Sequence, residues 1–158
     1  MQDVPQRGRL TDQLLAYLRA DTSLSEWGMV IGDGDPPPEA GWSGHQPGVG
    51  DFVASATVRT AQAVPLHRET VRNRHSSWRC RYGIRSVGAL RPHADHAADL
   101  TRAAVVEFRD LPMQGPAGWR IQDAVYESLG GVEKRGAGDN ATFDVDDVVD
   151  IWVVRAAT

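Results

Sequence analysis

The chain has 158 residues, of which 41% are hydrophobic and 24% are charged, and its formal net charge is −4. This balance is typical of a single soluble globular domain, here expected to span residues 1–158. The negative net charge excludes nucleic-acid binding through the electrostatic field of the whole protein. It does not exclude binding through a local basic surface. Its one cysteine, Cys80, rules out an intrachain disulfide and a cysteine zinc cluster, and we expect it to be a small buried hydrophobic residue.

The first predicted element is a helix over about residues 10–20, where Leu10, Leu14 and Leu18 recur at helical spacing. Residues 25–50 are expected to form an irregular surface loop, because three consecutive prolines at 36–38 fit neither a helix nor a central strand. The first residues lack the pattern of a signal peptide, and no apolar run approaches the ~18 residues of a membrane span. We therefore expect no membrane partner and a protein made in the cytoplasm.

Two long strands joined by a basic connection come next. Residues 51–66 alternate as a half-buried strand, and their length predicts a bulge near 61–64. Alternation from Trp78 to Val87 predicts the second strand. The connection at 67–76 carries Arg68, Arg72 and Arg74, so we expect a hairpin whose tip contacts a partner.

A second helix follows the break at Gly88. It opens at Pro92, and its small and apolar residues share one face. Two further strands are predicted at 119–127 and 143–155, with a glycine-rich connection between them. This order predicts an α+β fold: a single domain with a mainly antiparallel four-stranded sheet and helices packed on one face.

Two groups of side chains suggest metal chemistry. His93, His96 and Asp99 share the first turns of the second helix, and the last strand carries four aspartates. A small metal-dependent hydrolase is the alternative function of a different class. A complete metal site needs three or four ligands and activating partners. For neither group does the sequence show another cluster that would supply the rest. We therefore expect no catalytic residue, no metal, no cofactor and no enzymatic activity.

Charged residues also form two rows. Arg79, Arg81 and Arg85 occupy one face of the Trp78 strand. Alternation places three aspartates on one face of the last strand; these are Asp144, Asp146 and Asp150. The two rows can neutralise each other across neighbouring strands, or they can meet between the subunits of a ring. An arginine row that lines a channel would also attract passing DNA without reading its sequence.

The central part of the chain resembles a known family. The strand residues 82–88, followed by a helix through Ala94-Asp95, Ala98-Asp99 and 102–105, are similar to the middle of tail terminator proteins of long-tailed bacteriophages. The resemblance extends over most of the chain as architecture and over about 25 residues as a recognisable pattern.

The resemblance implies a structural assembly protein of the virion tail. Such a subunit forms a hexameric ring that caps the tail tube and joins it to the head connector or stopper protein, with DNA passing through the lumen. It implies the tail tube protein, the connector and other copies of the chain as partners. The contact residues expected in this role are Arg68, Arg72, Arg74, Arg79, Arg81, Arg85, Asp144, Asp146 and Asp150. A neighbouring head–tail connector or head-completion protein is the alternative within the same class.

Overall fold

A computed structural model describes the backbone of residues 5–44, 46, 48–69, 74–115 and 118–155; the side chains of 61–69, 74–76, 127–129 and 140 lie outside the description. Its helices are α1 (Arg7–Arg19), α2 (Thr22–Glu26) and α3 (Arg91–Val106), with a 3₁₀ turn at Gly138–Asn140. Its strands are β1 (Val30–Asp33), β2 (Gly41–Trp42), β3 (Phe52–Val53), β4 (Ser55–Glu69), β5 (Arg74–Gly88), β6 (Leu111–Pro112), β7 (Trp119–Arg135) and β8 (Thr142–Arg155).

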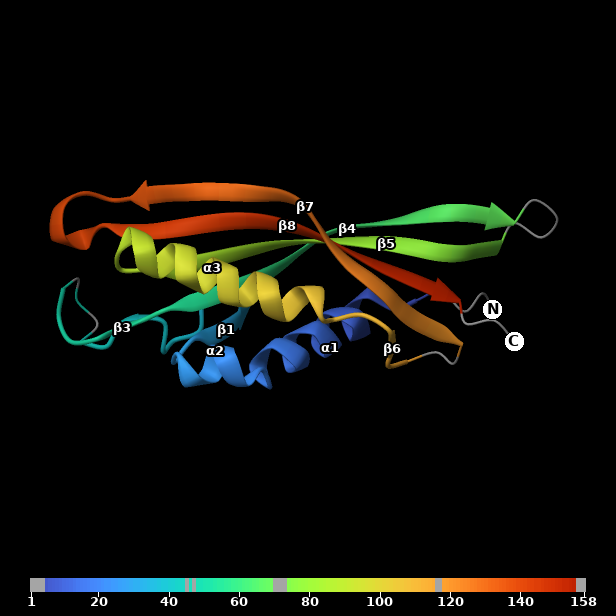
Figure 1. The fold of residues 1–158 in the computed structure, drawn as a ribbon, viewed down its shortest axis with the longest axis horizontal. Helices are drawn as coiled ribbons and strands as arrows, with labels where there is room; N and C mark the ends of the chain where they lie inside the picture. The colour runs from blue at the N-terminus through green and yellow to red at the C-terminus, as the bar shows by residue number, and fades with distance from the viewer. Residues whose placement is uncertain (1–4, 45, 47, 70–73, 116–117, 156–158) are drawn as a thin grey trace.

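One large sheet organises the molecule. Six strands lie in the order β1-β4-β5-β8-β7-β6, and β2 pairs with β3 in a separate small sheet. The β1–β4 pair is parallel, whereas the other pairs in the large sheet are antiparallel. The long hairpins β4–β5 and β7–β8 meet at the β5–β8 pair, so the last strand in chain order lies inside the sheet (Figure 1).

The helices pack against the sheet and close the core. Figure 1 shows α1, α2 and α3 in front of the strands. The α1 stripe predicted from sequence is fully buried at Leu10, Leu14 and Leu18, and Tyr82 and Phe108 are buried with it. Removing such large side chains from water is the main stabilising term in a domain of this size. No helix in the described part of the chain is long and apolar enough to cross a membrane.

The predicted fold class is wrong in its sheet. The fold is mainly β, with a six-stranded mixed sheet in place of four antiparallel strands. Strand β1 lies inside 25–50, the stretch predicted to be irregular, and is too short to show a periodic pattern. Its Ile31 is buried because parallel pairing with β4 places β1 over α1. Strand β6 escaped prediction for the same reason of length.

Two glycines allow close approach of neighbouring elements. A Cβ at Gly88 would lie 2.6 Å from the Ala94 nitrogen, so this glycine lets the first turn of α3 pack on the end of β5. A Cβ at Gly130 would overlap the Asp146 carbonyl oxygen. Gly130 stands where the β7–β8 register shifts between Leu129 and Val132, so β7 continues through a segment predicted to be a loop.

Several local predictions are confirmed. The register of β4 against β5 shifts between Thr60 and Gln62, where the sequence predicted a bulge. Helix α3 begins at Arg91 with Pro92 in its first turn, which suits a residue without an amide hydrogen. Cys80 is 2% exposed, and burial raises the pKa of its thiol to about 11. The thiol is therefore protonated and unreactive at neutral pH.

Candidate functional site

The two predicted charged rows lie side by side on adjacent strands. Arg81 stands opposite Asp150 and Arg85 opposite Asp146 in the β5–β8 register. Arg81 Nε donates to Asp150 Oδ1 at 3.1 Å, and its Nη2 lies 3.3 Å from Oδ2. Arg79 Nη1 lies 3.9 Å from the same carboxylate. The Asp150 side chain is only 2% exposed, so the two arginines stabilise a buried negative charge.

A second group lies further along the same face. Arg85 holds Asp146 with two parallel hydrogen bonds of 2.8 and 2.9 Å, and it also lies 3.5 Å from the buried Asp144. Arg135 on β7 reaches Asp144 at 3.1 Å, so this charged face spans three strands. The forked pairing with Arg85 lowers the pKa of the Asp146 carboxyl.

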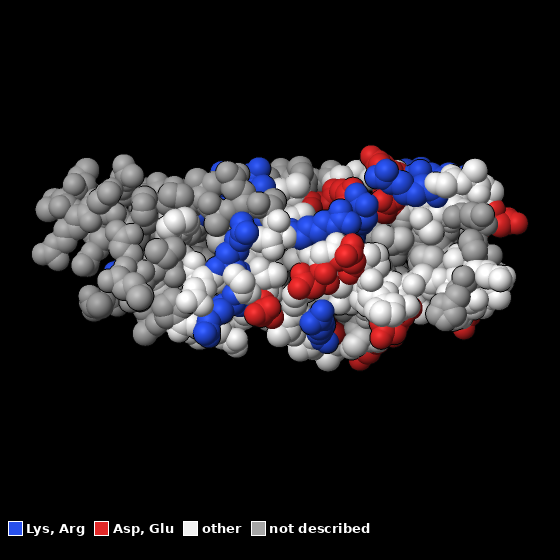
Figure 2. Space-filling model, turned by 180° about the vertical axis from the view of Figure 1, so that it is seen from behind, with Lys and Arg blue, Asp and Glu red and all other residues white. Residues whose placement is uncertain are grey.

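This charged face looks away from the helices. Figure 2, which views the molecule from behind, shows basic and acidic side chains interspersed across the middle of that face. Alternation had correctly placed Asp144, Asp146 and Asp150 together, and pairing across neighbouring strands is what the structure shows within one chain. Their role as partner or lumen contacts stays a prediction. Arg72 lies outside the described residues, and so do the side chains of Arg68 and Arg74.

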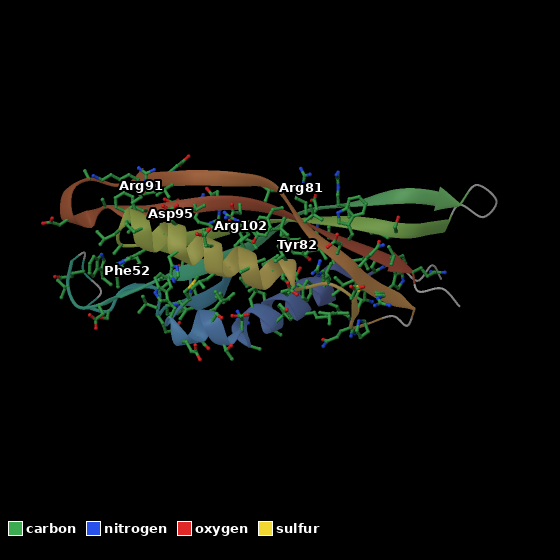
Figure 3. All side chains as sticks on the ribbon, in the orientation of Figure 1. Phe52, Arg81, Tyr82, Arg91, Asp95 and Arg102 are labelled. Carbon is green, nitrogen blue, oxygen red and sulfur yellow. The ribbon has the colours of Figure 1, made fainter. Side chains whose placement is uncertain are left out.

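A further ionic group, missed by sequence analysis, lies between α3 and the sheet. Arg102 donates to Asp99 at 2.9 Å and to the buried Asp147 at 3.4 Å, and its guanidinium stands 5.6 Å from the centre of the Tyr126 ring. The Gly130 amide also donates to Asp147 at 3.3 Å. Figure 3 labels Arg102, which lies between α3 and the sheet. Burial raises the pKa of the Asp147 carboxyl. The alternation of side chains along β8 could have revealed this group, because it places Asp147 on the core-facing side of the strand.

These two neighbouring aspartates predict opposite responses to pH. The pKa of Asp146 lies below 3.8 in the folded state, so its contribution to stability is present above about 3.8 and is lost as pH falls through the lowered pKa. The pKa of Asp147 lies above 3.8, so the free energy of unfolding falls as pH rises through that raised value.

The measurement is the free energy of unfolding by urea between about pH 3 and 6. Asp146→Asn is expected to flatten the loss of stability on the acid side. Asp147→Asn is expected to remove the opposing slope at higher pH. Profiles of the two variants that change in the same direction would contradict this assignment.

The side chains proposed as metal ligands have other neighbours. The His96 and His93 rings pack edge-on against Trp27, with centroids 4.8 and 6.4 Å apart, and Asp99 pairs with Arg102. Within the described ranges, no group of three or more His, Cys, Asp or Glu side chains is arranged to hold a metal ion.

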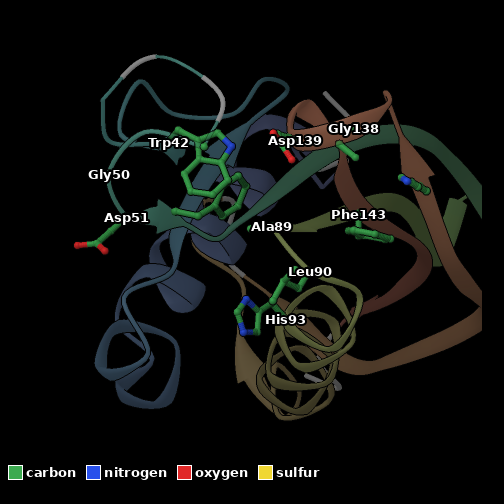
Figure 4. A pocket seen from close by; sticks show the side chains of 13 residues that line it. Trp42, Gly50, Asp51, Ala89, Leu90, His93, Gly138, Asp139 and Phe143 are labelled. Carbon is green, nitrogen blue, oxygen red and sulfur yellow. The ribbon is translucent and has the colours of Figure 1, made fainter.

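An open cleft lies at one end of the sheet. Its volume is about 840 Å³, and it is bounded by the β2–β3 sheet, the first turn of α3 and the turn before β8 (Figure 4). Trp42 packs edge-on to Phe52 on one wall, and Leu90 and His93 lie on another. Leu90 is 54% exposed. The cleft is mixed in character, with Asp51, Asp139 and Lys134 also on its walls.

Comparison with known proteins gives a fold similarity only. No family model matches the chain, and no curated protein matches it. A chain from the virion of a native gene transfer agent particle superposes with a TM-score of 0.54 at 17% identity, covering 89% of this chain and 91% of that one. A second solved chain, which carries no descriptive name, has a TM-score of 0.50 at 16% identity and covers 96% and 94%. The fold is therefore one that a virion chain also adopts.

Proposed function

We propose that this chain is a structural subunit of a phage-like virion, acting as a tail terminator that forms a ring on the tail tube and joins it to the head connector. The observation that carries the proposal is the fold similarity to a chain of a gene transfer agent virion over nearly the whole length of both chains. The sequence pattern shared with tail terminators supports the finer role. Its partners are then other copies of the chain, the tail tube protein and the head connector.

The charged face suits a surface past which DNA moves. Its arginines are about one third exposed and already engaged by aspartates, so they offer phosphate groups a weak attraction. Tight binding would hinder passage. The same pairing occupies the carboxylates that a metal-dependent hydrolase would need, which favours assembly over catalysis as the proposed role.

Particles assembled without this protein test the role. We expect tail tubes of irregular, often excessive length that fail to join heads, because nothing then stops addition of tube subunits. Electron microscopy measures both properties. Tubes of uniform length that cannot join heads would indicate a connector instead, and normal infectious particles would reject a structural role in the tail.

A further inference from the structure

At each edge of the large sheet, a short strand covers only one end of the long strand beside it, and the two covered ends lie at opposite ends of the sheet. Strand β1 covers β4 only up to Val58, and β6 covers β7 only up to Ile121. Among the described strands, residues 59–69 of β4 and 122–135 of β7 therefore have no strand neighbour on their outer sides. We call the first side, with β1, the β1 edge and the second side, with β6, the β7 edge.

The register places the two steps at different levels along the sheet. The pairing can be followed across the strands from β1 to β7. Val30 on β1 pairs with Ser55, Ser55 with Val87, Val87 with Asp144, and Asp144 with Glu133 on β7. Asp33 aligns in the same way with Leu129. The protruding strand β1 thus stands at the level of 129–133, where the β7 edge is recessed. The protruding strand β6 stands at the level of Pro65, where the β1 edge is recessed.

We infer that a second copy of this chain occupies the β7 edge, with its β1 strand in the recess beside residues 129–133. The inference rests on the self-assembly in the proposed function. Strand β1 is parallel to β4, and directions alternate from β4 to β7, so a neighbour in the same orientation brings β1 antiparallel to β7. Unlike edges then join head to tail, the contact type that closes into rings.

Residues of opposite charge stand at matching levels on the two edges. On the β1 edge, exposed Arg19 donates to the outward carbonyl of Ile31 at 3.2 Å, and exposed Arg59 donates to the Gly34 carbonyl at 3.0 Å. Acidic residues lie there as well: Asp33 on β1, and Glu39, which lines a pocket together with Arg19 and Ile31. On the β7 edge, Glu133 is exposed, aligns with the start of β1 and pairs with Arg135 of its own chain at 2.9 Å.

On β7, the acidic Asp123 precedes residues 129–133, whereas Lys134 and Arg135 follow them. Arg19 of one copy therefore faces Glu133 of the next. An exposed edge strand invites pairing with another chain, and complementary charge fixes which chain and which register.

A charge exchange between copies tests the inference. Glu133→Arg and Arg19→Glu are made separately in the full chain, and self-association is measured by sedimentation over a wide range of concentration. Each variant alone is expected to associate at least about tenfold more weakly than the wild type, because like charges then face each other. An equimolar mixture is expected to restore association, since every contact then joins opposite charges. Asp95→Arg, at an exposed residue of α3, is the control, because α3 packs mostly on the inner strands β5 and β8.

Thermal unfolding of each variant shows whether it is folded. A folded pair of variants that does not recover on mixing would overturn the inference, as would variants that associate as tightly as the wild type. A wild-type chain that stays monomeric up to about millimolar concentration would overturn it as well. The proposed function fails separately, by normal tails in particles that lack the protein.

Discussion

Gly130→Ala is expected to lower the free energy of unfolding by about 1–3 kcal/mol or more, the usual cost of forcing extra atoms into a packed site. A Cβ there would overlap the Asp146 carbonyl oxygen, and backbone cannot move aside as a flexible side chain can. The β7–β8 pair would have to separate at its register shift. This would also disturb the hydrogen bond from the Gly130 amide to the Asp147 carboxylate.

The adjacent glycine gives a matched control. A Cβ at Gly131 meets no heavy atom within 4 Å, so Gly131→Ala should change stability by less than about 1 kcal/mol, with a small gain from the stiffer unfolded chain. Urea unfolding of both variants makes the comparison. Equal effects at the two positions would show that the strands do not approach as closely as described.

Replacing Arg79 and Arg81 together by glutamine is expected to cost about 2–4 kcal/mol, because the buried Asp150 carboxylate then loses two guanidinium partners. The value lies below that of a fully buried pair, since water reaches about one third of each arginine side chain. The sequence left open whether these arginines serve the fold or a partner. Their contacts make the stability of the isolated protein the first property to measure.

Rescue distinguishes the buried charge from a general loss of packing. Adding Asp150→Asn to the double variant removes the charge that lost its partners, so part of the lost stability should return. Arg120→Gln is the surface control, because Arg120 and its partner Asp110 are 51% and 73% exposed, and it should cost less than about 0.5 kcal/mol. A double variant as stable as the wild type would contradict a stabilising role for these arginines. The proposed role in assembly would then be the one left to test.

Sequence periodicity predicted the parts of the fold that depend on long amphipathic segments. The stripe of α1, the start of α3 and the inward side of β5 at Cys80 and Tyr82 follow from spacing alone. The two shortest strands of the large sheet sit at its edges, and β1 is held by its parallel neighbour and by packing on α1, interactions that no local pattern encodes. Sheet size was therefore predicted wrongly although most elements were found.

The charged face was predictable as two separate rows but not as one surface. Alternation assigns Arg85 to a face of its own strand and Asp146 to a face of another, yet only the order of strands in the sheet makes them neighbours. The partner of Asp147 was not predicted for a related reason. Alternation separates Asp147 from the row of Asp144, Asp146 and Asp150, but only the packing of α3 on the sheet brings it to Arg102.

The inner position of β8 has a consequence for synthesis. As the ribosome extends the chain, β4 and β5 can pair early, but β5 then presents a bare edge and an arginine row without its aspartates until β8 emerges. Pairing between β5 and β8 joins residues 55 to 77 apart in sequence, and such distant contacts form slowly. The nascent chain thus carries an open strand edge that invites aggregation while the residues between β5 and β8 are being made. The large sheet can therefore close only after β8 has been made.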